Sequence, residues 1–410
     1  MLRKNVNWAG NLAFSTERVH APQSVGEVQD VVRKATKAHA VGSRHSFSPI
    51  ADTDGAQISL RRLNRILAID KSARTINVEG GITYAELGPE LHRAGFALHN
   101  LASLPNISVA GAVATGTHGS GTTNLSAAVR GVKLVTAGGE VAEFRRGDPE
   151  FDGVVVSLGG LGVVVELSLD LEPSFEVVQD TYLDLPFDTL AANFEDIMGS
   201  GYSVSPFHSW SGDSIPKILV KSLATAPRRD GGFFGARTAL PSLPTPLDGD
   251  FPGQASTPVP WHQGLPHFQS EMVPATGAEL QAEYFVPQDQ ASAALRAVRS
   301  VQHHLEKVLI VSEIRTLTAD TMWLSPAFER ACLAIHFTCH PDLPALKVAL
   351  PAIEVALKPF DPRPHWAKVF TMSAEDIERS YPQLPQFRAL RKKLDPRGKF
   401  GNDFIDEFVG

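Results

Sequence analysis

The polar side chains best suited to chemistry lie in three short segments of the second half of the chain. Residues 311–316 and 333–339 have strand-like patterns, so Glu313 and Arg315 share one face of the first and His336 and Thr338 share one face of the second. Residues 366–370 are apolar except for Lys368. These side chains can accept a proton, stabilise negative charge and hydrogen-bond to a hydroxylated ligand. If they are buried, they need partners, either one another or a ligand with several hydroxyl groups.

Each of these residues also has an interpretation without chemistry. Glu313 and Arg315 could form an ion pair on a solvated sheet face. His336 could be a hydrogen-bonded core histidine. Lys368 could lie at a sheet edge with its ammonium group in water. The individual residues do not decide between these interpretations.

The uncharged residues 101–121 are rich in Gly, Ala, Ser and Thr. They show no stable period of 2 or 3.6, so we expect neither a half-buried strand nor an amphipathic helix. Small residues allow close approach of the backbone to a flat or anionic group and supply N–H and hydroxyl donors. A solvated glycine-rich loop is the alternative, but Val109, Val113 and the alanines are too apolar for it. The stretch therefore predicts a buried cofactor cradle.

A second loop of small, hydroxyl-bearing residues spans residues 40–48 and contains His45. It follows a short buried strand, so its backbone N–H groups could hold a phosphate. The sequence has neither the G-x-x-x-x-G-K-[ST] motif nor a G-x-G-x-x-G motif in a strand–helix context. The glycines of residues 159–162 precede an apolar strand, where tight packing is their expected role. Two such loops without these motifs indicate a large cofactor held by a different fold.

Mixed strands and helices are expected to position these segments. One helix begins at the capping-box pattern from Ser24 to Glu27 and ends near His39, and another begins at the pattern from Thr83 to Glu86. A regular strand–helix alternation of the doubly wound type is not present. The expected strands are residues 58–60, 66–70, 75–79, 132–136, 141–145, 163–170, 175–183, 203–210 and 280–286, with helices at 288–305 and 387–394.

Length and composition favour a soluble enzyme of two domains. The chain has 410 residues, more than one core usually serves, with 43% hydrophobic and 20% charged residues. A net charge of −7 argues against nucleic acid or an anionic membrane as partner. No stretch resembles a signal peptide or a membrane span. Residues 226–268 are rich in Pro and Gly and are expected to form an ordered surface loop, because Phe233, Phe234, Trp261 and Phe268 would need cover.

The two cysteines, Cys332 and Cys339, lie too close together for a useful disulfide framework and fit a reducing cytosol. A zinc site built from His336, Cys339 and His340 is not expected. Positions 336 and 339 point to opposite faces of a strand, so three ligands could not converge. We expect no metal.

Several of these motifs together resemble one protein family. They are residues 41–46 with His45, residues 102–105, residues 109–121, residues 313–315 and residues 365–368, and the resemblance covers essentially the whole chain. The sequence closely resembles the bacterial alditol (xylitol) oxidases of the vanillyl-alcohol oxidase flavoprotein superfamily, in the aldonolactone oxidase branch. The resemblance implies an α+β protein with a two-domain PCMH-type FAD-binding fold. It also implies a discontinuous FAD-binding domain of residues 1–174 and 375–410 and a substrate-binding cap domain of residues 175–374, built on an antiparallel sheet flanked by helices.

The resemblance implies FAD as cofactor, joined covalently through its 8α-methyl group to His45. Arg44 stands where the family pattern leads us to expect Gly, and a positive φ there would cost about 1 kcal/mol. The expected cofactor contacts are Ala40, Val41, Gly42, Ser43, Arg44, His45, Ser46, Ala102, Ser103, Ser108, Gly111, Thr115, Gly116, Thr117, His118, Val163 and Lys368.

In an alcohol-oxidising site, we expect His336 to accept the hydroxyl proton, while Arg315 and Lys368 stabilise developing alkoxide charge. Ser103, Glu313, Arg315 and Thr338 are expected to bind the hydroxyl groups of the substrate. By resemblance, Lys368 lies near the N1–C2=O edge of the flavin and Ala102 faces its C4a atom.

The expected reaction is oxidation of the terminal (C1) hydroxyl of alditols such as xylitol and sorbitol to the aldose, with O₂ reduced to H₂O₂. The alternative is an aldonolactone or polyol dehydrogenase with another electron acceptor. A flavin- or sugar-binding module without catalysis is disfavoured by the full set of acid, base and cations. We expect a cytoplasmic monomer whose partners are a small polyol and O₂, not nucleic acid or a membrane.

Overall fold

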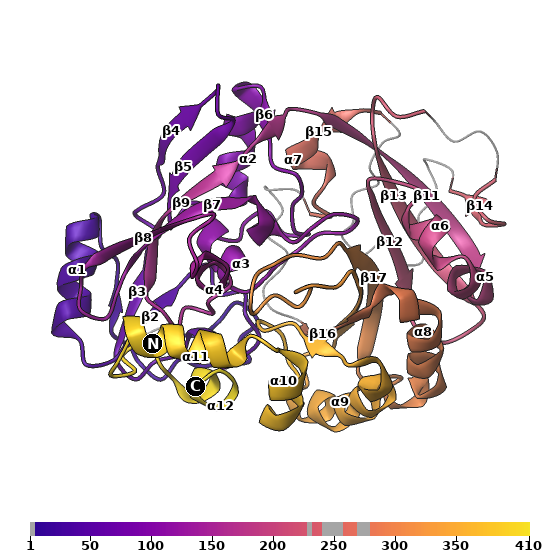
Figure 1. The fold of residues 1–410 in the computed structure, drawn as a ribbon. Helices are drawn as coiled ribbons and strands as arrows, with labels where there is room; N and C mark the ends of the chain where they lie inside the picture. Colours follow the sequence, from indigo (N-terminus) through magenta and orange to yellow (C-terminus); the bar gives the residue numbers. More distant parts are fainter. Residues whose placement is uncertain (1–4, 228–231, 240–256, 269–278) are drawn as a thin grey trace.

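The computed structural model describes residues 5–227, 232–239, 257–268 and 279–410. In Figure 1 the first half of the chain, indigo to purple, forms the left side, and most of the second half forms the right side around one large sheet. The C-terminal helices, in yellow, lie beneath the first half of the chain.

The first half contains three sheets. One is parallel, with the order β1 (Val19–His20), β3 (Ala56–Ser59) and β2 (Ala38–Val41). A five-stranded antiparallel sheet has the order β4 (Ile66–Asp70), β5 (Thr75–Glu79), β9 (Val163–Asp170), β7 (Val129–Val135) and β8 (Val141–Arg145). β6 (Phe96–Ala97) pairs with β10 (Glu172–Pro173). Most of these strands lie within three residues of the predicted bounds, and those of β4, β5, β8 and β9 are as predicted.

Helix α1 (Val25–Lys34) forms half of the predicted capping box. Ser24 accepts the N–H of Glu27, but the Glu27 carboxylate accepts the N–H of Gln23 instead of that of Ser24. α1 also ends at Lys34 and not near His39, which lies in β2. By contrast, α2 (Tyr84–Arg93) begins with a complete capping box.

Residues 109–114 form the short helix α3 (Val109–Ala114), where no helix was predicted. Val109, Ala112 and Val113 are buried on one face, but six residues are too few to show a period over a usual window. The other helical elements of the first half are η1 (Pro49–Ala51), η2 (Leu125–Ala128) and α4 (Phe151–Val155).

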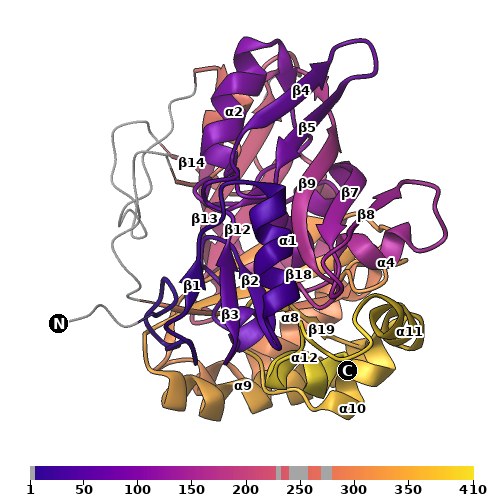
Figure 2. The same ribbon diagram turned by 90° about the vertical axis from the view of Figure 1, so that its left-hand side faces the viewer.

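The second half forms one large antiparallel sheet. Its order is β14 (Arg237–Thr238), β11 (Glu176–Pro186), β13 (Ser214–Leu223), β12 (Ser203–His208), β17 (Leu309–Leu317), β18 (Cys332–Cys339), β16 (Leu280–Pro287) and β19 (Arg363–Pro364), with β15 (Val259–Pro260) beside β11. Helices flank it (Figures 1 and 2). They are α5 (Phe187–Ala192), α6 (Phe194–Met198), α7 (Trp261–Gly264), η3 (Gln288–Gln290), α8 (Ala291–Ser300), η4 (Gln302–His304), α9 (Leu343–Leu357) and η5 (Lys358–Phe360).

Register in this sheet places three charged or titratable residues side by side. His336 of β18 is paired with Glu313 of β17 on one side and with Glu283 of β16 on the other. The alternate residues of β18, Ile335 and Phe337, are fully buried in the apolar core. The sheet therefore has one apolar face and, at its centre, a polar row on the other face.

The chain finishes with α10 (Ala374–Ser380), α11 (Leu384–Leu394) and α12 (Asp403–Phe408). Residues between α11 and α12 bind the first half of the chain, since the Phe400 carbonyl lies 2.9 Å from His39 Nδ1 and Lys399 donates to the Val32 carbonyl. Asn402 also donates to the Asp52 carbonyl at 2.9 Å. The proposed division into residues 1–174 with 375–410 and residues 175–374 stays a prediction.

One predicted helix of the second half differs from the structure, and one predicted loop is described in part. Residues 288–305 form η3, α8 and η4 instead of one helix. In the loop of residues 226–268, the side chains of Phe233 and Trp261 are fully buried, as the need for cover predicted. Pro241, Pro244, Pro246 and Pro252 lie outside the described residues. Among the helices described, none combines the length and apolar character needed to cross a bilayer.

Candidate active site

A cavity of about 1070 Å³ extends from the two small-residue loops to the polar face of the large sheet. Its volume is at the upper end of the roughly 300–1,000 Å³ range of ordinary ligand pockets. One end is lined by residues 39–48 and parts of residues 102–118, and the other by Glu283, Glu313, Arg315, His336 and Lys368. It therefore has room for a large cofactor with a small substrate beside it.

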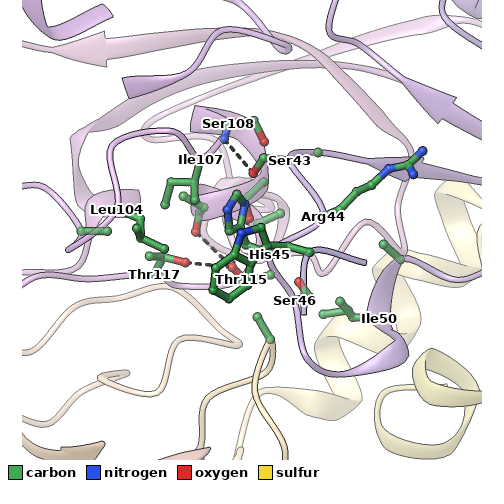
Figure 3. A pocket seen from close by; sticks show the side chains of 18 of the residues that line it. Ser43, Arg44, His45, Ser46, Ile50, Leu104, Ile107, Ser108, Thr115 and Thr117 are labelled. Atoms are coloured by element: carbon green, nitrogen blue, oxygen red, sulfur yellow. Dashed lines mark hydrogen bonds between the residues drawn. The ribbon is translucent and has the colours of Figure 1, made fainter. Parts of the chain in front are cut away.

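The two small-residue loops contact each other at this cavity. The Ser43 hydroxyl accepts the backbone N–H of Ser108 at 3.2 Å (Figure 3). A Cβ added to Gly42 would lie 2.4 Å from Ser108 Oγ, and one added to Gly111 would lie 2.7 Å from the same atom. Neither position can hold a side chain without movement. Gly42 allows the two loops to come together, and Gly111 leaves space for the Ser108 side chain of its own loop.

His45 has the environment expected of a cofactor attachment point. Its Nδ1 atom is buried and has no hydrogen-bond partner among the residues described, and burial lowers the pKa of the imidazole to about 4. The ring stacks on Trp8, with 5.4 Å between ring centroids. A buried polar atom without a partner costs free energy, so this unpaired nitrogen, on a residue that lines a cofactor-sized cavity, fits a bond to a bound group.

Arg44 adopts the left-handed conformation that a glycine would favour, with a φ of 65°. Its carbonyl accepts the N–H of Trp8 at 2.8 Å, and its guanidinium lies over the Phe14 ring, 5.6 Å from the centroid. Figure 3 shows its side chain pointing away from His45. These contacts accompany a backbone strain of roughly 1 kcal/mol.

Most of the predicted cofactor residues line the cavity. Val163 and Gly116 are not among its lining residues: the Val163 side chain packs in the core with Val28 and Val32, although its neighbours Gly162 and Val164 do line the wall. The residues that do line it are Ala40, Val41, Gly42, Ser43, Arg44, His45, Ser46, Ala102, Ser103, Ser108, Gly111, Thr115, Thr117, His118 and Lys368.

Glu283, which the sequence analysis did not single out, forms the centre of the polar end of the cavity. Its fully buried carboxylate accepts from Arg315 at 2.5 Å and from Lys368 at 2.7 Å, and it lies 3.4 Å from His118 Nε2. Burial alone would raise the pKa of Glu283, but the charges of Arg315 and Lys368 outweigh it and hold the pKa well below its usual value. Glu283 is therefore an internal counter-ion for both cations.

Lys368, His336 and Thr338 form a hydrogen-bonded row. Lys368 Nζ lies 2.6 Å from His336 Nδ1, and His336 Nε2 lies 3.0 Å from the Thr338 hydroxyl. Burial, supported by the Lys368 charge, lowers the pKa of His336 to about 4. Burial also lowers the pKa of Lys368 to about 8, although Glu283 opposes this shift. His336 and Lys368 are close enough to titrate as a pair.

Glu313 is held by a residue from another part of the chain. His267 Nε2 lies 2.9 Å from Glu313 Oε1, while Arg315 Nε lies 3.8 Å from Glu313 Oε2. Arg315 Nε has no hydrogen-bond partner among the described residues. Burial would raise the pKa of Glu313, but the charge of Arg315 and the hydrogen bond from His267 keep it well below its usual value. Glu313 and Arg315 thus lie next to each other at the cavity wall, with the Arg315 Nε atom buried behind it.

Ser103 is far from the large sheet in the sequence, but it is hydrogen-bonded to the same segment, residues 267–268, that contacts Glu313. Its carbonyl accepts the backbone N–H groups of His267 and Phe268, at 3.2 and 3.1 Å. Ala102, beside it, is buried and lines the cavity. All the predicted substrate-binding residues, Ser103, Glu313, Arg315 and Thr338, therefore line one cavity with His336 and Lys368.

His118, Glu283 and His365 present ligand atoms within 4.8 Å of one another, as some metal sites do. The same carboxylate, however, already contacts the cationic groups of Arg315 and Lys368. A divalent cation would have to enter against these two positive charges. The cluster is better explained as a hydrogen-bonded ion network. Cys339, from the zinc site considered above, faces the apolar core.

Comparisons with known proteins agree with this geometry. A family model for an FAD binding domain matches residues 16–145, and one for D-arabinono-1,4-lactone oxidase matches residues 278–408. The chain is 45% identical to an alditol oxidase from a Streptomyces species, with 98% of each chain covered. It is 29% identical to an L-gulono-1,4-lactone dehydrogenase of Mycobacterium tuberculosis, covering 98% of each chain, and 28% identical to L-gulonolactone oxidase of Mus musculus, covering 98% of this chain and 97% of that one.

Among solved structures, a solvent-stable cholesterol oxidase matches with a TM-score of 0.78 at 17% identity, covering 99% of this chain and 97% of that one. This similarity confirms the predicted fold class, a two-domain FAD-binding fold of helices and antiparallel sheets. The chain is therefore a flavin-dependent oxidoreductase that belongs to the vanillyl-alcohol oxidase flavoprotein family, in its aldonolactone oxidase branch, with alditol oxidase among its relatives.

Proposed function

We propose that this protein oxidises the terminal (C1) hydroxyl of an acyclic polyol such as xylitol or sorbitol to the aldose, with O₂ reduced to H₂O₂. One observation carries the proposal: the buried ion network around Glu283 opens into the same cavity as the small-residue loops that carry His45. The alditol oxidase relative supports the substrate class. The two cysteines are buried and unpaired, which is compatible with a reducing cytoplasm. The monomeric state stays a prediction.

Residues 40–48 and 102–118 would hold FAD, and we propose that His45 forms the covalent link. The orphaned His45 Nδ1 and the glycine contacts at Gly42 and Gly111 support this assignment. When bound, FAD supplies the hydride acceptor for the carbinol carbon. The protein must therefore place that carbon, exclude water and handle the hydroxyl proton.

Glu313 can bind a hydroxyl group of the substrate. A hydroxyl donates one hydrogen bond, and Glu313 Oε2, 3.8 Å from Arg315 Nε, is the acceptor left for it because Oε1 contacts His267. Ser103 and Thr338 provide hydroxyls on the same cavity. A simple alkanol would leave these buried groups unpaired, so the site should discriminate against it.

Proton removal is best assigned to the Lys368–His336 pair. While Lys368 is an ammonium, it donates to His336 Nδ1, so Nε2 carries the imidazole proton towards Thr338 and cannot accept another. Once Lys368 is neutral, the tautomer can reverse and Nε2 becomes the acceptor for the substrate proton. Arg315, which remains charged, then stabilises the developing alkoxide.

The electron acceptor distinguishes the two candidate functions. Ala102 contributes only a methyl group to the cavity wall, and this small side chain favours access of O₂. The M. tuberculosis relative is named a dehydrogenase, so a polyol or aldonolactone dehydrogenase is the second candidate.

A panel of alditols and aldonolactones tests both functions. The holoenzyme is mixed with each compound under air while peroxide is measured, and anaerobic bleaching of the flavin spectrum is recorded in parallel. Stoichiometric peroxide from xylitol or sorbitol supports the oxidase. Bleaching by a substrate without peroxide, with turnover restored by an artificial dye, supports the dehydrogenase.

A further inference from the structure

Lys221 on β13 is a fully buried lysine that does not line the cavity. Its ammonium lies 2.6 Å from the Leu265 carbonyl, 3.2 Å from the Pro266 carbonyl and 3.2 Å from His267 Nδ1. In the part of the chain that the structure describes, no carboxylate lies within ion-pair distance of it. Burial lowers the pKa of Lys221 to about 7. A buried ammonium without a directly contacting anion is costly, so its three acceptors must be held firmly.

These contacts determine which nitrogen of His267 carries the proton. Glu313 is ionised and its carboxylate can only accept, so the hydrogen of His267 lies on Nε2 and Nδ1 is left to accept from Lys221. Nε2 donates to Glu313 Oε1 at 2.9 Å. His267 is itself buried, with its ring against the edge of Phe207 at 5.7 Å between centroids. One oxygen of Glu313 is thereby occupied, and the other is directed to Arg315 and the cavity.

The same segment fixes the opposite wall. The backbone N–H groups of His267 and Phe268 both donate to the Ser103 carbonyl. Residues 265–268 thus connect Lys221 in the sheet, Glu313 on β17 and Ser103 in the loop before α3. Any shift of this segment changes the distance between the two residues proposed to contact the polyol.

We propose that Lys221 and His267 are positioning residues that set specificity for the polyol hydroxyls remote from the oxidised carbon, by holding Glu313 and Ser103 at a fixed separation. This inference rests on the proposed polyol oxidation. It goes beyond that proposal because it assigns recognition of the length and remote hydroxyls of the polyol to Lys221 and His267, which take no part in hydride or proton transfer.

The test compares sorbitol with 1,2-hexanediol, which has the same number of carbons and the same first two hydroxyls but lacks the remote ones. Anaerobic flavin reduction of the holoenzyme gives a limiting rate and a half-saturating concentration for each substrate. Two matched variants are His267→Gln, whose amide nitrogen reaches the position of imidazole Nε2, and His267→Asn, whose amide does not. Lys221→Met removes the donor to residues 265–267.

We expect His267→Asn and Lys221→Met to lower the ratio of sorbitol to diol efficiency about tenfold, the effect of losing one hydrogen bond to an ionised group. The change should come mainly from the half-saturating concentration of sorbitol. His267→Gln should retain most of the wild-type ratio. Flavin content and unfolding midpoint are measured on every variant.

Two results would overturn the inference while leaving the proposed function intact: an equal loss for both substrates, or a loss in His267→Gln as large as in His267→Asn. Either would mean that the segment only stabilises the fold. If the wild-type protein reduces its flavin with neither substrate, the polyol proposal fails, and the specificity assignment fails with it.

Discussion

Glu283 Oε2 accepts a hydrogen bond from Lys368 Nζ at 2.7 Å, although Glu283 lies in the middle of a strand and Lys368 in a loop 85 positions later. The other carboxylate oxygen binds Arg315. One buried anion therefore contacts two buried cations, and with the ionised Glu313 beside Arg315 the four charges of the site balance while Lys368 is protonated.

Glu283→Gln should destabilise the protein by about 3–5 kcal/mol, because it removes the carboxylate partner of the buried Lys368 and leaves the buried Arg315 with only the more distant Glu313. The free energy of unfolding is measured by urea denaturation. Glu354→Gln is the matched control, since that carboxylate accepts hydrogen bonds from neutral groups, the Tyr284 hydroxyl and the Thr371 N–H. Similar losses in the two variants would contradict the counter-ion role.

The rate constant of flavin reduction should rise with pH and level off above an apparent pKa near 8. The pKa of His336 is about 4 and that of Lys368 about 8, so near neutral pH the proton that must be lost is that of the lysine. Anaerobic stopped-flow reduction between about pH 6 and pH 10 measures this profile. Lys368→Met should move the apparent pKa towards that of the histidine. A rate that falls above pH 8 would mean that the ammonium itself is required.

Glu313→Gln should raise the polyol concentration needed for half-saturation more than it lowers the limiting rate. The carboxylate contacts a hydroxyl that is present before and after hydride transfer, so its effect is mostly uniform binding. Arg315→Met is the contrasting variant, and its limiting rate should fall about 100- to 1000-fold. The reason is that the Arg315 guanidinium stabilises negative charge that grows during the reaction. Should Glu313→Gln abolish the limiting rate while His336→Ala does not, Glu313 is the base.

Covalent FAD at His45 predicts yellow fluorescence that stays with the protein on a denaturing gel. His45→Ala should lose this fluorescence, because the orphaned Nδ1 is then absent. His340→Ala removes an exposed histidine and should keep it. Complete release of flavin from the acid-precipitated wild-type protein would show that the linkage is absent.

Ala102→Val should slow reoxidation of the reduced flavin by O₂ while anaerobic reduction by the polyol is largely kept. The added methyl groups would occupy space on the cavity wall that a small residue leaves open. Ala110→Val adds the same volume elsewhere on that wall and serves as control. If both half-reactions slow equally in Ala102→Val, the cradle is distorted and O₂ access is not the cause.

Sequence patterns predicted elements best where burial alternates. β9 has strictly alternating buried and half-buried residues, and its bounds were predicted without error. α3 was missed because it is short and lacks any charged residue to mark a solvent face. Period-based reasoning needs both length and a contrast between faces.

The candidate site was predictable only in part. Glu313, Arg315, His336 and Lys368 were identified and do line one cavity. Glu283 was missed because a single carboxylate in a strand is usually solvated, and its cationic partners come from distant segments. His267 was missed because it lies in a Pro-rich stretch whose path the local sequence does not determine. Such long-range pairings require the fold itself.

The hydrogen bonds that residues 399–402 make to the region around β2 have a consequence for the order of biosynthesis. β2 leads directly into the loop that carries His45. The β2 residue His39 nevertheless contacts the Phe400 carbonyl, which lies 361 positions later in the chain. During translation the loop leaves the ribosome long before these residues exist. The packing behind the flavin-binding loop is therefore complete only after residue 402 has been synthesised.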